Sequence, residues 1–322
     1  MGTPPSIDGT TTGSVVQGTG DLVNGDLDDV GGNNAADTWS IQTGSTYGTA
    51  SIDPATGAWT YDLDDTNAAV IALTPGDTLI DTFTVQVTDI WGSDTQVVTI
   101  TINGAPCFMA GTEIETRDGP RRVETLSAGD LVFTDDFGLQ PLRWIGGRNV
   151  SHAEMKDDEK KRPIRISKGA LGKNLPERDL MVSRQHRILV QGALVEQLYD
   201  VAEVFLPAVR LLGIPGVEVV LPDHDIEFIH LLFDQHQVVF AEGVGSESFL
   251  FGKQARMTLN QESALEIIAL FPSAEDQLRL ARAARPIPPL AAQKLFALHW
   301  RPEHGPFAKA FDKTAQTPVT AV

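Results

Sequence analysis

Several runs within the first hundred residues alternate apolar and polar side chains with a period of two, which is the pattern of half-buried β-strands. Residues 82–88 and 96–102 are rich in β-branched side chains, and such residues favour strands. Residues 47–52 and 58–61 form two further runs on either side of a turn cluster at 53–57. Short strands joined by turns at this spacing predict a β-sandwich.

The pattern changes after a Gly-Ala-Pro sequence at residues 104–106, which predicts a domain boundary. Residues 107–252 again predict mostly strands, now with charges of both signs. Within them, the charged stretch 150–162 predicts an exposed loop, and residues 228–240 predict one buried strand.

The C-terminal part predicts helices. Apolar residues recur at helical spacing in 259–270 and 275–284, and prolines end both patterns. From about residue 308 onward the chain has no periodicity, which predicts a loose tail.

Charge is distributed very unevenly between the two parts of the chain. Residues 1–106 contain 14 Asp and no Glu, Lys or Arg, whereas the rest contains 29 acidic and 25 basic residues. A surface without cations repels phosphate, so the first part is not expected to bind nucleic acid or an anionic membrane. High charge also has the simpler role of keeping a protein soluble.

Cysteine content and hydropathy limit the class of protein further. The single cysteine excludes an internal disulfide. The chain has no run of 18 or more apolar residues and no basic segment followed by an apolar one at its start, so neither a membrane span nor a cleavable signal peptide is predicted.

The first hundred residues contain a series of motifs, Tyr47-Gly48-Thr49, Asp53-Pro54-Ala55-Thr56-Gly57, Trp59-Thr60-Tyr61, Asp81-Thr82-Phe83 and Val87-Thr88-Asp89. This series resembles the VCBS/cadherin-like repeat of large secreted bacterial proteins. The resemblance implies an immunoglobulin-like sandwich, located outside the cell or at its surface, that contacts protein or carbohydrate; export would then use a route without a recognisable signal peptide. Calcium is a candidate ligand, and carboxylates are its possible donors. The candidate donors are Asp26, Asp28, Asp29, Asp62, Asp64 and Asp65.

Residues 105–252 contain a second series of motifs, Cys107-Phe108-Met109-Ala110-Gly111-Thr112, Gly129-Asp130-Leu131-Val132, Pro141-Leu142-Arg143-Trp144-Ile145-Gly146, Ser183-Arg184-Gln185-His186, His230-Leu231-Leu232-Phe233-Asp234-Gln235-His236 and Glu247-Ser248-Phe249. This series resembles a bacterial Hedgehog/intein (Hint) domain. Together the two resemblances imply a mainly β protein, in which an immunoglobulin-like β-sandwich (1–104) precedes an all-β Hint domain (105–252) and a short helical extension with a tail (253–322).

The chemistry that this resemblance implies is an N-to-S acyl shift at the bond between Pro106 and Cys107. The Cys107 thiolate attacks the Pro106 carbonyl and forms a thioester, because sulfur is intrinsically nucleophilic. His186 is the expected proton donor to the departing nitrogen, and Ser183 is expected to hydrogen-bond the amide or the tetrahedral oxygen. The substrate is the chain itself, and no organic cofactor is required.

Three further residues are weaker candidates. His230 and His236 are expected as acid–base helpers, or with Asp234 as metal ligands, while Asp130 is expected chiefly in a turn.

The sequence departs from the pattern of this family at two points, which leave other functions open. Asn260 is the only asparagine after residue 174, so the His-Asn ending of splicing inteins is missing, and splicing is not expected. A prolyl carbonyl such as that of Pro106 is a sluggish electrophile. The alternatives are therefore a degenerate, non-catalytic Hint domain in an extracellular adhesion or binding protein, and a cysteine hydrolase that acts on other proteins.

Overall fold

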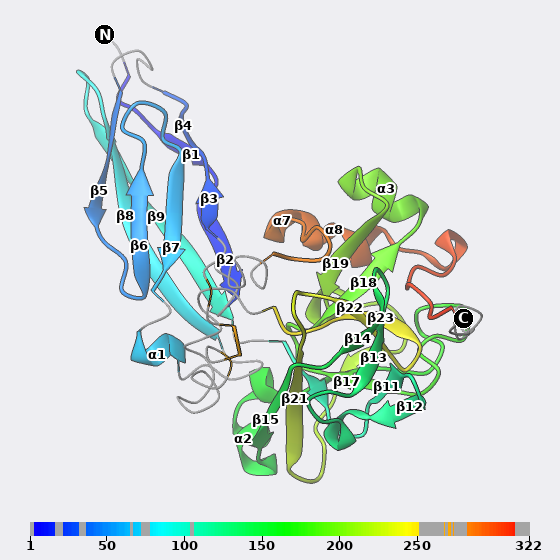
Figure 1. Cartoon of the computed structure of the whole chain (residues 1–322). Coiled ribbons are helices and arrows are strands. Elements are labelled where there is room, and N and C mark those ends of the chain that lie inside the picture. The colour runs from blue at the N-terminus through cyan, green and yellow to red at the C-terminus, as the bar shows by residue number, and fades with distance from the viewer. Residues whose placement is uncertain are drawn as a thin grey trace. The chain divides into compact units, whose positions relative to one another are not determined.

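The computed structural model describes residues 3–16, 22–31, 37–64, 67–71, 78–103, 106–250, 267, 270–271, 273 and 282–312 of the chain (Figure 1). The chain divides into two compact units. The first comprises Met1–Ala105 and Phe251–Ala281, and the second comprises Pro106–Leu250 and Arg282–Val322.

The first unit is built from strands arranged in a four-stranded sheet of order β2-β9-β8-β5, a three-stranded sheet of order β3-β7-β6, and the pair β1-β4. Strand β2 runs parallel to β9, and the other neighbours are antiparallel. The elements are β1 (Ile7–Gly9), β2 (Thr12–Val16), β3 (Val23–Gly25), β4 (Leu27–Asp29), β5 (Thr38–Thr43), β6 (Gly48–Ile52), β7 (Trp59–Leu63), the short helix α1 (Ala68–Ile71), β8 (Thr78–Thr88) and β9 (Ser93–Asn103).

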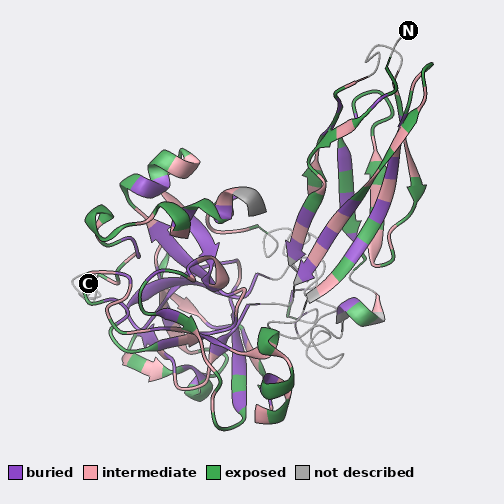
Figure 2. Ribbon diagram, turned by 180° about the vertical axis from the view of Figure 1, so that it is seen from behind, coloured by how far each residue is buried: buried purple, intermediate pink, exposed green. Residues whose placement is uncertain are grey.

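The core of this unit confirms the sandwich that the alternating pattern predicts. Along β7 buried and exposed residues alternate without exception. Residues 81–88 of β8 also alternate between buried and more exposed positions, and Figure 2 shows such alternation on strands of this unit. Trp59, Tyr61 and Phe83 are fully buried, and the rings of Trp59 and Phe83 meet edge to face with centroids 5.6 Å apart. The predicted runs 82–88 and 96–102 lie inside β8 and β9, which pair along their whole length.

The second unit contains a six-stranded sheet of order β15-β21-β10-β17-β16-β20 and an eight-stranded sheet of order β12-β11-β13-β22-β23-β18-β19, with β14 paired to β13. The strands are β10 (Phe108–Met109), β11 (Glu113–Thr116), β12 (Gly119–Arg122), β13 (Leu131–Thr134), β14 (Gly138–Pro141), β15 (Trp144–Val150), β16 (Ile164–Ile166), β17 (Leu180–Val182), β18 (Arg187–Gln191), β19 (Glu203–Pro207), β20 (Val217–Val219), β21 (Ile226–Leu232), β22 (Val238–Ala241) and β23 (Val244–Glu247).

Short helices connect or cover these strands. They are η1 (Val123–Thr125), α2 (His152–Asp157), η2 (Glu159–Lys161), α3 (Ala193–Tyr199), η3 (Ala208–Arg210), α7 (Leu290–Gln293), α8 (Leu295–His299) and η4 (Pro302–His304). The described residues are therefore mainly β with few helices, as predicted. No helix among them is long and apolar enough to cross a membrane.

The stretch 150–162 is not the exposed loop that its charge predicts. Ser151 caps α2 through a capping box with Glu154, and η2 follows directly. Met155 on α2 is fully buried. A single buried apolar residue is enough to dock a helix whose other side chains are mostly polar or charged, and an expectation based on composition overlooks such a contact.

The stretch 228–240 is also not one strand. Strand β21 ends at Leu232, β22 begins at Val238, and His236 lies in the connection between them. Because a turn intervenes, the strand rule that side chains two residues apart share a face does not apply to His230 and His236.

The end of the described chain is ordered. Ala308 and Ala310 form isolated bridges with Val190 and Val244, and Phe307 is buried in the core of the second unit. The loose tail predicted from about residue 308 is therefore wrong for residues 308–312. The helices predicted at 259–270 and 275–284 lie, apart from a few residues, outside the described residues.

Candidate functional site

Strand pairing brings Cys107 between two other polar residues of the second unit. Phe108 on β10 pairs with Ile229 on β21 on one side and with Val182 on β17 on the other, and both pairings are antiparallel. Cys107 directly precedes β10, and if the same register is continued by one residue, Cys107 lies opposite His230 on one side and opposite Ser183 on the other. The short strand β10 thus positions the cysteine between residues from two distant parts of the chain.

His230 contacts both the thiol and the carbonyl that precedes it. The Sγ atom of Cys107 lies 3.4 Å from Nδ1 and 3.3 Å from Nε2 of His230. The Nδ1 atom of His230 also lies 2.8 Å from the carbonyl oxygen of Pro106. A carbonyl only accepts hydrogen bonds, so Nδ1 carries the proton in this contact, and Nε2 is then the acceptor of a neutral ring.

Ser183 contacts both backbone polar groups of Cys107. The Cys107 N–H donates to the Ser183 hydroxyl oxygen at 2.9 Å, and the Ser183 N–H donates to the Cys107 carbonyl oxygen at 3.0 Å. The nitrogen of the Pro106–Cys107 bond is therefore held by the Ser183 side chain.

The site is buried and mostly apolar. Cys107 is 1% exposed and packs with Val150, Met155, Ile226 and Phe228. Burial raises the pKa of the Cys107 thiol well above its ordinary value, and the negative charge of Glu247 raises it further. Burial lowers the pKa of His230 to about 4, although its hydrogen bond to Pro106 partly opposes this. At neutral pH the pair is consequently a thiol and a neutral imidazole, so the imidazole is available as a base.

His186 packs against the ring of Phe108. The two rings have their centroids 4.3 Å apart. Both ring nitrogens of His186 are buried, and neither has a hydrogen-bond partner in the described part of the chain. Burial lowers the pKa of His186 to about 4. The sequence-based role of His186 as proton donor stays a prediction, while His230 is the histidine in contact with the Cys107 thiol and the Pro106 carbonyl oxygen.

A buried ion pair lies near the histidines. The Arg187 guanidinium donates to Glu247 at 2.8 Å, and both side chains are almost fully buried. The Arg187 backbone N–H also donates to Glu247, at 2.6 Å. Burial alone raises the pKa of Glu247, but the charge of Arg187 and a contact with His236 outweigh it and lower the pKa to about 2. Glu247 thus keeps a permanent negative charge close to His186.

The remaining candidates have other surroundings. Asp130 accepts a hydrogen bond from the Ser127 N–H at 2.8 Å and pairs with Arg121 at 2.9 Å, as expected of a turn residue. Asp234 pairs with Arg143, and His236 contacts the Ser248 carbonyl oxygen.

The described residues do not assemble a metal site. No three His, Cys, Asp or Glu side chains among them form a group that could hold a metal ion. Of the aspartates considered for calcium, Asp29 accepts hydrogen bonds from the Ser6 and Gly31 N–H groups within the sandwich, and Asp65 lies outside the described residues.

Sequence reasoning missed the importance of Arg187 and Glu247, although a signal was available. Arg187 begins β18 directly before the apolar run 188–190, and Glu247 ends β23. A charge that is buried beside such a run needs a partner. It also ranked His230 below His186, because the spacing along the chain does not reveal strand pairing.

The comparison with protein families identifies the second unit. Residues 106–253 match the family model described as Hint domain. This segment is a Hint domain. The match begins one residue before Cys107, and Hint domains as a class are autoprocessing modules, so an autoprocessing type of activity is supported in general terms.

Solved structures add weaker similarities. A bacterial intein-like domain from Clostridium thermocellum is 16% identical, with a TM-score of 0.30, and the match covers 44% of this chain and 95% of that one. The gp41-1 intein is 10% identical, with a TM-score of 0.26, and covers 44% of this chain and 97% of that one. Human protocadherin-24 EC1-2 is 13% identical, with a TM-score of 0.24, and covers 57% of this chain and 78% of that one. A search of curated proteins finds no match.

Proposed function

We propose that the chain cleaves its own peptide bond between Pro106 and Cys107, and that His230 is the general acid–base of this reaction. The observation that carries the proposal is the double contact of His230, with the Cys107 thiol on one side and the Pro106 carbonyl oxygen on the other. One neutral imidazole in this position can accept the thiol proton and polarise the carbonyl at the same time.

The first step forms the carbon–sulfur bond. The thiol proton moves to Nε2 of His230, and the thiolate attacks the carbonyl carbon of Pro106. The carbonyl oxygen becomes an oxyanion, which the Nδ1–H of His230 stabilises from 2.8 Å away. Because the site is buried and apolar, this hydrogen bond acts in a low dielectric, where it is stronger than in water.

The second step breaks the carbon–nitrogen bond. The tetrahedral intermediate collapses, the electron pair of the bond returns to the Cys107 nitrogen, and that nitrogen takes the proton from Nε2 of His230. Ser183 orients the nitrogen through its hydroxyl oxygen. The product is a thioester between Pro106 and the Cys107 side chain, which water or another nucleophile opens to release residues 1–106.

The proposal extends to the role of the released part. Residues 1–106 carry the VCBS/cadherin-like motifs and contain no Lys or Arg. This composition suits an extracellular or cell-surface module that binds protein or carbohydrate. Cleavage would separate this module from the Hint domain or transfer it to an acceptor nucleophile. Calcium binding by the same module would appear as a calcium-dependent increase in its melting temperature.

The test uses the purified full-length chain. Mass spectrometry should detect fragments of residues 1–106 and 107–322, with faster formation in hydroxylamine or excess thiol, because both open thioesters. Cys107→Ala should remain intact under the same conditions. A wild-type chain that stays whole in hydroxylamine would overturn the proposal and leave a non-catalytic Hint domain as the better account.

A further inference from the structure

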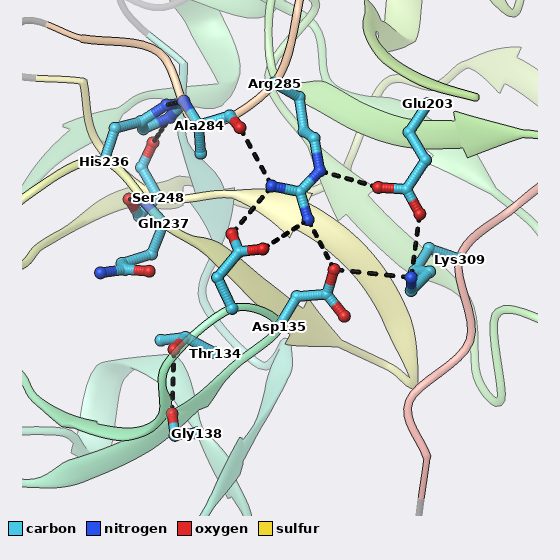
Figure 3. A network of polar contacts seen from close by, with 11 residues as sticks. Thr134, Asp135, Gly138, Glu203, His236, Gln237, Ser248, Ala284, Arg285 and Lys309 are labelled. Carbon is cyan, nitrogen blue, oxygen red and sulfur yellow. Dashed lines mark hydrogen bonds and ion pairs between the residues drawn. The ribbon is translucent and has the colours of Figure 1, made fainter. Parts of the chain in front are cut away.

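The segment 282–312 lies outside the Hint-matched residues but contacts them through a dense group of charges. We call this group the Arg285 network, and Figure 3 shows it from close by. Arg285 donates through Nε to Glu203 at 2.7 Å, through Nη1 to Asp136 at 2.8 Å and through Nη2 to Asp135 at 2.7 Å. Lys309 binds Glu203 at 2.9 Å from the far end of the same segment.

The network fixes the backbone next to Arg285. The Nη1 atom of Arg285 also donates to the carbonyl oxygen of Ala284, at 3.0 Å. The N–H group of Ala284 donates to Nδ1 of His236, again at 3.0 Å (Figure 3). Nδ1 is therefore the acceptor of a neutral ring, and the proton of His236 resides on Nε2. The segment thus selects one tautomer of a buried histidine.

That tautomer determines what His236 does on its other side. Its Nε2 lies 3.0 Å from the Ser248 carbonyl oxygen and can donate to it. Ser248 is also held by Gln237, whose N–H donates to the Ser248 hydroxyl oxygen at 2.8 Å and whose carbonyl accepts from the Ser248 N–H at 2.9 Å. Every polar group of Ser248 is consequently bonded.

Ser248 is followed by Phe249, which reaches the reacting histidine. The ring of Phe249 packs on the ring of His230 with centroids 4.6 Å apart. The Phe249 N–H donates to the Leu231 carbonyl oxygen at 2.8 Å, directly beside His230. A continuous series of contacts therefore runs from Arg285 through Ala284, His236 and Ser248 to the imidazole that touches Cys107.

We infer that Arg285 and His236 are positioning residues, through which the C-terminal segment completes the catalytic site of the Hint domain. This inference rests on the proposed function of His230. It assigns the segment a role in setting the angle of the His230 ring, in addition to burying apolar surface. The ring must face the thiol and the Pro106 carbonyl together, so a small rotation disturbs both contacts.

The experiment compares Arg285→Gln with Arg282→Gln. The second variant is the matched control, because Arg282 is an exposed residue of the same segment and takes no part in the Arg285 network. In an uncleaved Cys107→Ala background, the ring nitrogens of His230 and His236 are followed by ¹⁵N nuclear magnetic resonance. In the chain with Cys107 intact, the rate of cleavage is followed well below the melting temperature of each variant.

We expect Arg285→Gln to shift the ring resonances of both histidines and to slow cleavage by at least about tenfold, since small misplacements of catalytic groups have effects of this size or larger. Arg282→Gln should leave both measurements unchanged. A variant Arg285→Gln that melts at a lower temperature, yet keeps the wild-type cleavage rate and the wild-type His230 resonances, would overturn the inference.

His236 provides a second test that leaves the Arg285 network in place. His236→Gln can still donate an amide N–H to the Ser248 carbonyl oxygen, whereas His236→Leu cannot. We expect the glutamine variant to retain most of the cleavage rate and the leucine variant to lose it, and equal rates would count against positioning. If the wild-type chain does not cleave at all, the proposed function fails, and the His230 resonances in Arg285→Gln still decide this inference.

Discussion

The thiol of Cys107 and the imidazole of His230 lie in contact, with Sγ 3.3 Å from Nε2, although 123 positions separate them along the chain. The contact follows from the pairing of β10 with β21, which sets the two residues opposite each other. On the other side of β10, its pairing with β17 places Ser183 next to the Cys107 nitrogen. The site is therefore held by the sheet and not by a flexible loop.

His230 should matter more for cleavage than His186. We expect His230→Gln to slow the reaction about 100-fold or more, which is the usual size of a general acid–base contribution. His186→Gln should have a smaller effect on the cleavage rate. His186 contacts the Phe108 ring, whereas His230 contacts the thiol and the Pro106 carbonyl oxygen. Mass spectrometry of each purified variant over time measures both rates. A larger loss with His186→Gln would return the acid–base role to that residue.

The Ser183 hydroxyl should contribute through its contact with the scissile nitrogen. Ser183→Ala removes the acceptor of the Cys107 N–H, and a neutral hydrogen bond of this kind contributes about 1 kcal/mol, or about fivefold in rate. Ser183→Thr keeps a hydroxyl and should retain activity close to wild type. Cleavage assays at one temperature compare the rates of the alanine and threonine variants. An alanine variant as fast as the threonine variant would show that the contact is structural only.

Folding stability should fall between about pH 6.5 and pH 4. Burial lowers the pKa of both His186 and His230 from 6.5 to about 4, so the folded chain keeps them neutral where the unfolded chain is already protonated. The stabilisation is complete above pH 6.5 and is lost as the pH falls through 4, by roughly 3 kcal/mol per histidine. Glu247 has a pKa of about 2 in the folded chain and changes its contribution only below about pH 4.5.

Denaturant unfolding of Cys107→Ala at a series of pH values measures this loss. His186→Gln should reduce the slope of stability against pH in this window, because it removes one buried titrating group. His224→Gln is the control, since the His224 side chain is 67% exposed. A stability curve for Cys107→Ala that is flat from pH 7 to pH 4 would contradict the burial of neutral histidines.

The Arg187–Glu247 pair should be costly to break from one side. Glu247→Gln leaves the Arg187 guanidinium, which is 3% exposed, without a counter-charge, and we expect a loss of about 3–5 kcal/mol in unfolding free energy. The double variant Arg187→Met with Glu247→Leu should recover much of this loss. Chemical denaturation of wild type, Arg187→Met, Glu247→Leu and the double variant forms a closed double-mutant cycle and gives the coupling free energy. Additive effects would show that the two side chains do not depend on each other.

Some of these features could be predicted without a structure. The strands at 82–88 and 96–102 follow from local alternation, because a period of two places one set of side chains in a core regardless of what lies opposite. The Hint domain was predictable from the motif that begins at Cys107 and the block that ends at His186. Local signals were misleading for 150–162 and for residues 308–312, where a few buried contacts fix segments whose composition is that of exposed chain.

The sequence alone determined the fold class, the Hint segment and the cysteine at its start, because each depends on residues that are close together in the chain. Only the tertiary structure decided which histidine meets that cysteine and which carboxylate pairs with Arg187. It alone also revealed the link from Arg285 to His236. These contacts depend on strand register and on chain segments that meet across many intervening residues, and no local pattern of side chains specifies such a register.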